Sequence, residues 1–309
     1  MNAKHISERR HPPPAIIFFH KRYDPYIAFA LWQARTTNPQ SPVYLLGDQT
    51  NDLSFLGIHH VPFGRYPGRS REFIALYEHF SPHELECERL CIERYFHIAD
   101  FVEQERIGPF IYLDSDVLLL MDLSSFVPAW QEYDIAGTPG LYGACYYRRR
   151  GVPREFCEFI LERYRDSSQI ETWRNDWRSP GPGRPRVPVQ DMLLSRMFLE
   201  ETGLRCLDLC QPRDGIAFNS NFLVTEKQCL PVFRHPTEPG VFAELNGRHV
   251  RMACLHFGGW SKRLASGFVD WSWPLVRCFF KPNYRRNLKK LVQYYYFGRA
   301  LRRRIPFAQ

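Results

Sequence analysis

The sequence predicts an α/β protein built on a mixed, mostly parallel sheet that helices flank. In the N-terminal part of the chain, short apolar runs alternate with longer stretches of helical periodicity, and parallel strands need such helical crossovers. With 309 residues, of which 44% are hydrophobic and 15% aromatic, the chain can also bury a large core. We therefore exclude an intrinsically disordered chain.

The chain is expected to open with a strand, a helix and a second strand. Ala15–Phe19 and Val43–Asp48 are short apolar runs closed by polar or turn residues, and Asp24–Arg35 between them has helical spacing. A third short run, Ile58–Phe63, follows. This order is a β-α-β unit, which implies parallel pairing.

Two helices and a buried strand are expected next. The helical stretch 70–104 contains Ser81–Glu84, whose Ser-Pro-His-Glu sequence is typical of a helix start. Phe110–Asp114 then has the aromatic and β-branched content of a buried strand. Parallel sheets bind ligands at the carboxyl ends of their strands, so Asp114 lies where a site is expected.

Two carboxylates, Asp114 and Asp116, interrupt the apolar segment "FIYLDSDVLLLMDL". Residues two apart in a strand face the same side, so the two side chains are expected to converge. Adjacent like charges need a cation or strong hydrogen bonds, and Mg²⁺ or Mn²⁺ suits oxygen ligands. The alternative is an exposed turn at the strand end, without a ligand.

A second polar group follows a later strand, in "RMACLHFGGWSK". His256 ends the apolar run, and the glycines Gly258 and Gly259 allow the backbone to approach a ligand closely. Lys262 is placed to meet a phosphate as a point charge. His256 by itself would be a packed or surface residue. Together with the two aspartates, this group predicts a site for a metal and a nucleoside diphosphate.

These segments resemble GT-A-fold glycosyltransferases. "YLDSDVLLLMDL" looks like their Asp-x-Asp segment, and "HFGGWSK" is similar to the His-x-x-Gly-x-x-Lys signature of the retaining, glycogenin-like and bacterial galactosyltransferase-like branch. Uncharacterised bacterial capsule-type glycosyltransferases are similar in "LCIERYFHIADFV" and "FCEFILERY". The resemblance implies a GT-A (Rossmann-like) fold, a nucleotide-sugar donor that is often UDP-linked, and Mn²⁺ (or Mg²⁺) held by Asp114, Asp116 and His256. Lys262 and Gly259 would lie at the donor diphosphate.

The segment "VPVQDMLLSRMF" resembles the acidic and amide element of this family. Gln190 and Asp191 fall on its Gln-Asp pair, which implies catalytic roles, whereas Val189 and Arg263 depart from the residues usual at their positions. We expect transfer with retention, in which a nearby Gln or Asp stabilises the cationic sugar. An N-cap role for Asp191 in the helix that follows is the alternative, and both roles can hold.

Three further residues are weaker candidates for the donor site. His20 and Tyr23 follow the first strand, where this fold usually receives the base, and Arg71 opens a helix. Turn residues without a ligand and a solvated helix start are the alternatives. "GLYGACYY" either borders the sugar or forms a bulge, and Arg178–Pro188 predicts an irregular loop that is a lid or a linker.

The positive charge is concentrated at the C-terminus. From Trp271 to Gln309 there are ten Lys or Arg and no acidic residue, which leaves 41 − 10 = 31 basic against 33 acidic residues elsewhere. We expect an N-terminal extension (1–14), a GT-A domain (15–270) and a basic aromatic tail (271–309). The tail predicts attachment to an anionic membrane surface, and a helix packed on the domain is the alternative.

The remaining expectations concern location and class. The nine cysteines are odd in number and follow no secretory signal, so we expect reduced thiols and a cytoplasmic protein, peripheral on the inner face of the membrane. The acceptor would be a carbohydrate or a lipid-linked molecule. Two other classes stay open: a nucleotidyl or phosphoryl transfer enzyme on the same metal site, and a non-enzymatic basic binding protein. No nucleic acid partner is expected, since no known module is present.

Overall fold

The computed structural model describes residues 12–141, 143–179 and 186–269. Nearly all of these belong to one compact unit that ends at Gly267. The basic aromatic tail (271–309) lies outside the described residues, as do residues 1–11 of the expected N-terminal extension and the centre of the Pro/Gly-rich loop.

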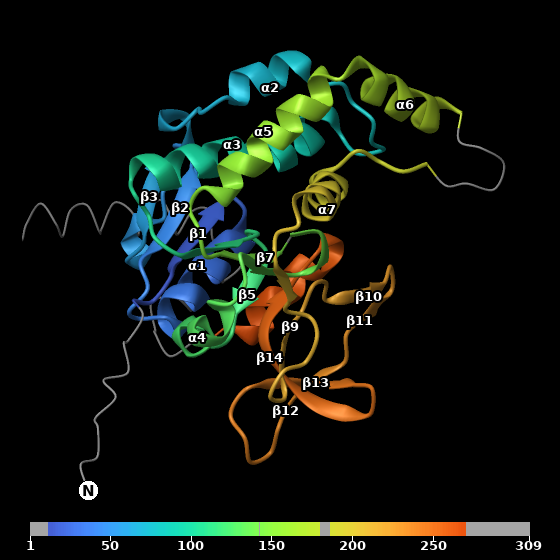
Figure 1. Cartoon of the computed structure of the whole chain (residues 1–309). Helices are drawn as coiled ribbons and strands as arrows, with labels where there is room; N and C mark the ends of the chain where they lie inside the picture. The colour runs from blue at the N-terminus through green and yellow to red at the C-terminus, as the bar shows by residue number, and fades with distance from the viewer. Residues whose placement is uncertain (1–11, 142, 180–185, 270–309) are drawn as a thin grey trace, which may run out of the picture. The chain divides into compact units, whose positions relative to one another are not determined.

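A seven-stranded sheet forms the centre of the unit (Figure 1). In spatial order its strands are β3 (His59–Pro62), β2 (Val43–Gly47), β1 (Ala15–Phe19), β4 (Phe110–Leu113), β7 (Ala144–Tyr147), β6 (Ile135–Gly137) and β8 (Cys206–Asp208). Only β7 runs against its neighbours, since it pairs antiparallel with both β4 and β6 while the other pairs are parallel. The predicted mixed, mostly parallel sheet is confirmed.

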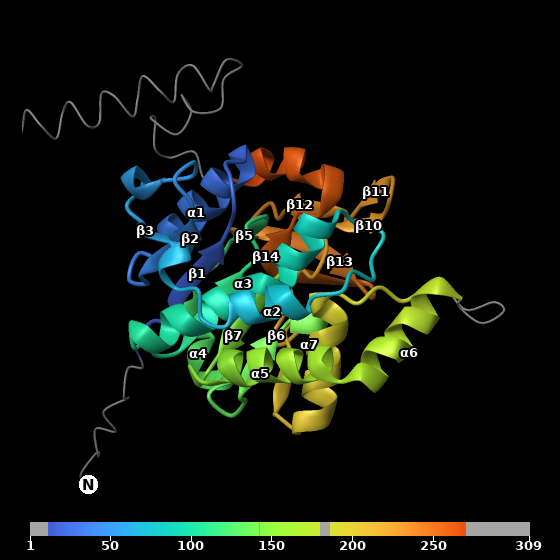
Figure 2. The ribbon, with the colours of Figure 1, turned by 90° about the horizontal axis from the view of Figure 1, so that it is seen from above.

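Helices cover both faces of this sheet. Figure 1 shows α2, α3 and α5 on one side and α1 and α4 on the other, and Figure 2 looks down on the first group. The helices are α1 (Pro25–Thr37), α2 (Ser70–Leu76), α3 (Leu85–Gln104), α4 (Val127–Trp130), α5 (Val152–Arg165), α6 (Ser167–Arg178) and α7 (Asp191–Thr202). Short 3₁₀ turns are η1 (Ser54–Leu56), η2 (Phe63–Arg65), η3 (Leu123–Ser125), η4 (Pro139–Leu141) and η5 (Gly259–Phe268).

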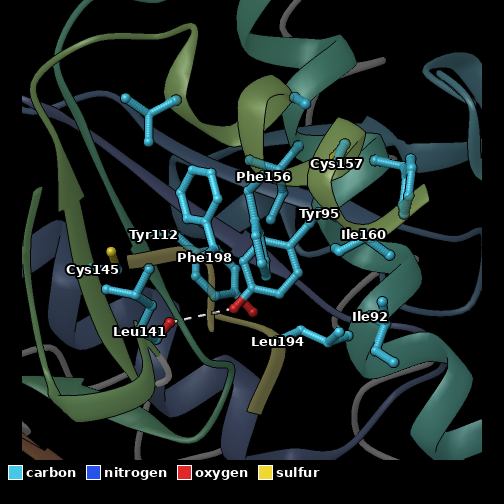
Figure 3. Packing of buried hydrophobic residues seen from close by; sticks show 14 of the residues in the cluster. Ile92, Tyr95, Tyr112, Leu141, Cys145, Phe156, Cys157, Ile160, Leu194 and Phe198 are labelled. Carbon is cyan, nitrogen blue, oxygen red and sulfur yellow. Dashed lines mark hydrogen bonds between the residues drawn. The ribbon is translucent and has the colours of Figure 1, made fainter. Parts of the chain in front are cut away.

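The core between the sheet and α3, α5 and α7 is rich in aromatic rings. Tyr112 of β4 points to this side, where Tyr95 of α3 meets Phe156 of α5 edge-on at 5.0 Å (Figure 3). The Tyr95 hydroxyl donates to the carbonyl of Leu141 at 3.3 Å. Such rings are large and stiff, so they fix the distance between α3 and the end of β4.

A second sheet brings a distant part of the chain to the end of β4. Its path is β12 (Val232–Arg234), β13 (Val241–Leu245), β14 (Arg248–His256) and β5 (Val117–Leu119), and β9 (Ile216–Phe218) also pairs with β14. A separate hairpin consists of β10 (Leu223–Thr225) and β11 (Gln228–Cys229). Because β14 pairs antiparallel with β5, His256 lies opposite Val117, one residue after Asp116.

One predicted boundary is wrong. The second helix of the stretch 70–104 begins at Leu85, with Glu84 as N-cap, and not at Ser81. The Ser81 hydroxyl donates to Glu88 at 2.7 Å and accepts from the backbone of His83. Ser81 therefore closes a bend before the helix, which explains why its sequence looks like a helix start.

Candidate active site

Asp114 and Asp116 lie in the turn that joins β4 to β5. The prediction that they converge is confirmed, but the predicted reason is wrong, because neither residue is in a strand. The backbone N–H of Val117 donates to the carbonyl of Asp114 at 3.0 Å and closes the turn. Asp114 accepts further bonds from the Tyr112 hydroxyl at 2.8 Å and from the Gly143 N–H at 2.9 Å. The turn thus holds both carboxylates at the carboxyl end of β4.

His256, at the end of β14, faces these carboxylates. Its Nε2 lies 3.2 Å from Asp116 Oδ1 and 4.0 Å from Asp114 Oδ2. One ligand atom from each of the three residues lies within 4.8 Å of the others. Among the residues that the structure describes, this is the only group of three or more His, Cys, Asp or Glu with that geometry.

The chemistry of the three side chains fits a divalent metal. His256 Nδ1 donates to the carbonyl of Ser220 at 2.6 Å, which leaves Nε2 directed at the two aspartates. Asp114 has supporting hydrogen bonds of its own from Tyr112 and Gly143. A Cβ atom at Gly143 would lie 3.0 Å from His256 Nδ1, a tight contact that the ring could accommodate only by shifting. Two carboxylates and an imidazole suit Mn²⁺, and Mg²⁺ would bind through the carboxylates.

Lys262 of η5 lies beside this group. Its ammonium is 3.1 Å from Asp116 Oδ2 and 4.5 Å from the centre of the Tyr26 ring, at the start of α1. Tyr26 in turn contacts His20, whose ring is 5.6 Å away, and His20 Nε2 lies 3.5 Å from Asp24. Tyr26 and Asp116 therefore hold the lysine at the edge of the aspartate turn.

Opposite charges set the protonation of this part of the site. Burial opposes the charge of Asp116, but His256 and Lys262 outweigh it and lower the pKa of Asp116 to about 2. Burial would likewise neutralise His256, yet its bond to Asp116 raises the pKa of His256 to about 9. The pKa of Lys262 is raised above its ordinary value by Asp116, against burial.

Arg94, in the interior of α3, joins Asp114 to Asp191. Its Nη1 lies 2.8 Å from Asp114 Oδ1 and its Nη2 lies 2.6 Å from Asp191 Oδ2. The guanidinium also packs against the rings of Tyr95 and Tyr112, at 5.3 and 5.2 Å. Only 12% of the Arg94 side chain is exposed. The two carboxylates, Asp114 first, raise the pKa of Arg94 against its burial, so it stays charged.

Asp191 is the first residue of α7, so the alternative N-cap role belongs to Gln190 instead. Burial, together with the nearby charges of Asp114 and Glu88, raises the pKa of Asp191 to about 6 although Arg94 opposes this. The Gln190 amide donates to Glu88 at 3.0 Å and so points to α3. Of the Gln-Asp pair, Asp191 alone reaches the cavity described next.

A cavity of about 400 Å³ opens above these groups. It is lined by Phe19, His20, Lys21, Tyr26, Cys87, Leu90, Cys91, Arg94, Asp114, Ser115, Asp116, Asp191, Met192, His256 and Lys262. The cavity thus brings together six of the predicted site residues, namely His20, Asp114, Asp116, Asp191, His256 and Lys262. Tyr23, Gln190 and Gly259 do not line it, and Arg71 lies exposed on α2. Within "GLYGACYY", Gly140 and Leu141 belong to η4 and residues 144–147 form β7. The register of β7 against β4 is regular, so β7 does not contain the bulge that was the alternative.

Arg94, Tyr26 and Gly143 were not predicted as site residues. Cys87, Leu90, Cys91 and Arg94 are spaced three or four apart, so they lie on one helical face, and all of them line the cavity. That spacing is the signal that could have found Arg94. Gly143, with φ of +77°, belongs to the glycine pair of "GLYGACYY".

No helix among the described residues is long and apolar enough to cross a bilayer. No family model matches the chain, and no curated protein matches it either.

Several solved structures of glycosyltransferases are similar to this chain. Mouse xyloside xylosyltransferase 1 is 8% identical, with 69% of this chain and 88% of that chain covered and a TM-score of 0.47. The galactosyltransferase LgtC, in complex with donor and acceptor sugar analogues, is 14% identical, with 84% and 99% covered and a TM-score of 0.42. The glycosyltransferase GlyE of Streptococcus pneumoniae is 18% identical, with 64% and 45% covered and a TM-score of 0.36. All three TM-scores lie below 0.5, so the function proposed next is drawn from the site itself.

Proposed function

We propose that the protein is a metal-dependent glycosyltransferase that moves a sugar from a nucleotide-sugar donor, UDP-linked, to a glycan or lipid-linked acceptor, with retention. The observation that carries the proposal is the convergence of Asp114 and Asp116, from the turn between β4 and β5, with His256, from the end of β14. Lys262 lies beside them, and all four residues line one cavity.

Transfer of a sugar breaks the bond between its anomeric carbon and the diphosphate. Negative charge then grows on the leaving oxygen, while the sugar becomes cationic. A divalent metal held by Asp114, Asp116 and His256 would supply positive charge at the diphosphate. Lys262, 3.1 Å from Asp116, is within reach of the same diphosphate. Tyr26 holds its ammonium there.

Asp191 is the residue that we assign to the sugar. It lies on the far side of Arg94 from Asp114, so the guanidinium connects the metal side of the cavity with the sugar side. An ionised carboxylate at that place would stabilise a cationic sugar. Gln190 precedes Asp191 as the N-cap of α7 and bonds Glu88, so its catalytic role stays a proposal from the sequence alone. His20 lines the cavity where a base or ribose would enter, and Gly259 lets the backbone turn beside Lys262. Tyr23 and Arg71 stay weaker proposals.

A panel of UDP-, GDP- and CMP-sugars with Mn²⁺ tests the proposal. Release of the nucleoside diphosphate without acceptor is expected for at least one UDP-sugar. A CMP-sugar would release CMP in the same reaction class. Cleavage of a UDP- or GDP-sugar between its two phosphates, with release of sugar 1-phosphate, would instead indicate nucleotidyl or phosphoryl transfer. Two-metal enzymes of that kind need more carboxylates than the three, Asp114, Asp116 and Asp191, that line this cavity.

A further inference from the structure

One aromatic side chain stands out at the rim of the site. Among the Phe, Tyr and Trp residues that the structure describes, only Trp260 is classed as exposed, with 39% of its surface accessible. Its neighbours in η5 are Gly259 and Ser261, whose small side chains leave the indole accessible. An indole combines a large apolar face with one N–H donor, so it can contact a ligand face-on.

The indole of Trp260 is held in place. Its Nε1 donates to the carbonyl of Glu226, in the turn of the β10–β11 hairpin, at 2.8 Å. Gly259 precedes it with φ of +53°, and a Cβ there would touch Leu223 of the same hairpin at 3.5 Å. Because the N–H of the indole is already bonded to Glu226, a ligand would contact the face of the ring. A fixed ring also loses little conformational entropy on binding.

The segment that carries the hairpin is continuous with the site. Asn219 Oδ1 accepts from the backbone N–H of His256 at 3.1 Å, and the Ser220 carbonyl accepts from His256 Nδ1. Phe222 N–H donates to the His256 carbonyl at 2.6 Å. The residues that orient His256, a proposed metal ligand, therefore lead directly into the hairpin whose turn bonds the indole of Trp260.

Trp260 and Lys262 belong to the same 3₁₀ helix, two residues apart. Two residues along such a helix advance about 4 Å, so the backbone of Trp260 lies close to that of Lys262, which lines the cavity. Trp260 does not line the cavity itself. Residues three apart in a 3₁₀ helix share a face, which places the exposed Arg263 on the side of Trp260. This face thus combines an aromatic ring with five N–H donors.

We propose that Trp260 is a stacking platform for a sugar ring of the acceptor, at a position away from the reacting hydroxyl. The inference rests on the proposed function. A pyranose has an apolar face of C–H groups and an equatorial belt of hydroxyls, and it fits an indole face flanked by a guanidinium. A purely apolar partner would leave the N–H donors of Arg263 without acceptors, whereas sugar hydroxyls supply them, so an oligosaccharide is the occupant that this face matches.

Saturation-transfer NMR on the full chain tests the inference, with UDP and Mg²⁺ present. The probes are methyl glycosides of glucose, galactose and N-acetylglucosamine, together with lactose, maltose and cellobiose. At least one disaccharide is expected to receive saturation from the wild-type chain. Trp260→Ala should weaken its binding about two- to tenfold, as for loss of an aromatic pair, and Trp260→Phe should retain part of it. Unchanged melting temperatures would show that both variants fold.

Leu264→Ala is the matched control, because Leu264 lies in the same 3₁₀ helix and is also 39% exposed. Binding that is equal in Trp260→Ala and the wild type overturns the inference. So does an equal loss in Leu264→Ala, or no saturation of any probe by the wild-type chain. Failure of the proposed function would be seen in a different experiment, in which the wild-type chain would release no nucleotide from any nucleotide-sugar when metal is added.

Discussion

Arg94→Met is expected to destabilise the protein strongly. The substitution keeps a long side chain between Tyr95 and Tyr112 but removes the cation that contacts both Asp114 and Asp191, at 2.8 and 2.6 Å. The exposed fractions of the three side chains are 12%, 13% and 9%. Two carboxylates would therefore be left in a poorly solvated place without this counter-charge.

The expected loss follows from what each carboxylate retains. Removing one partner of a buried ion pair typically costs about 3–5 kcal/mol. Asp114 keeps the Tyr112 hydroxyl and the Gly143 N–H, whereas Asp191 keeps the N–H of Met192 at 2.9 Å. Because Asp114 stays well bonded, we expect the lower end of that range, about 3 kcal/mol at pH 8.

The loss should depend on pH in one direction. The pKa of Asp191 is about 6 in the folded protein, above the ordinary value of 3.8, and the loss of Arg94 would remove a charge that lowers it. In the variant this pKa therefore lies above about 6. Between the wild-type value and that higher value the folded variant binds more protons than the folded wild type, so the variant loses stability relative to the wild type as the pH rises through that window. The destabilisation by Arg94→Met is therefore largest at pH 8 and shrinks towards pH 5, where Asp191 is neutral.

Urea denaturation at pH 5 and pH 8 measures these effects. The set comprises the wild type, Arg94→Met, Asp191→Asn and the double variant, and the resulting double-mutant cycle isolates the coupling between Arg94 and Asp191. The double variant should recover part of the loss. Arg196→Met is the matched control, since Arg196 pairs with Glu200 at the surface and is 64% exposed. A loss below about 1 kcal/mol at pH 8, or an equal loss at both pH values, would refute the reasoning.

Three further predictions concern the proposed metal site, the binding of the diphosphate and the C-terminal tail. Gly143→Ala should weaken Mn²⁺ binding, measured by calorimetry, because a Cβ there lies 3.0 Å from His256 Nδ1; Gly203→Ala, with φ of +64° and no atom within 4 Å of the new Cβ, carries the backbone strain alone and should bind Mn²⁺ normally. Lys262→Ala should weaken UDP binding by about 1.5–3 kcal/mol while Lys227→Ala does not, and an unchanged affinity would place Lys262 outside the site. The intact chain should float with phosphatidylglycerol-containing liposomes at low salt, and equal flotation of a chain ending at Ser272 would show that the tail is not the anchor.

The sequence was sufficient to predict the central sheet and to select Asp114, Asp116 and His256 as candidate metal ligands. Strands of β-branched and aromatic residues closed by polar residues are local patterns; Asp114 directly follows such a strand, and His256 is the last residue of another. The pairing of β14 with β5 was not predicted, yet it is this pairing that places His256 opposite Val117. Asp114 and Asp116 converge through a turn, which the alternation rule does not describe.

Arg94 shows what sequence reasoning lacked. An arginine inside an amphipathic helix looks like a solvated residue, and its role depends on how α3 is rotated against β4. That rotation is set by the rings of Tyr95, Tyr112 and Phe156, which are far apart in the chain. Asp191 similarly looks like an N-cap, and only the tertiary structure shows that it faces Arg94. The long-range packing was therefore needed to connect the two halves of the site.

The rate of nucleotide release from the preferred nucleotide-sugar, as Mn²⁺ is titrated into metal-free protein, tests the central proposal most directly. The account predicts no release without metal and a saturable rise with Mn²⁺. It also predicts that the rate of nucleotide release does not rise with Mn²⁺ in Asp116→Asn or His256→Ala, at unchanged melting temperature, since these residues would supply metal ligands. Full turnover of the metal-free wild-type protein in excess EDTA, or a normal Mn²⁺ response in both variants, would contradict it.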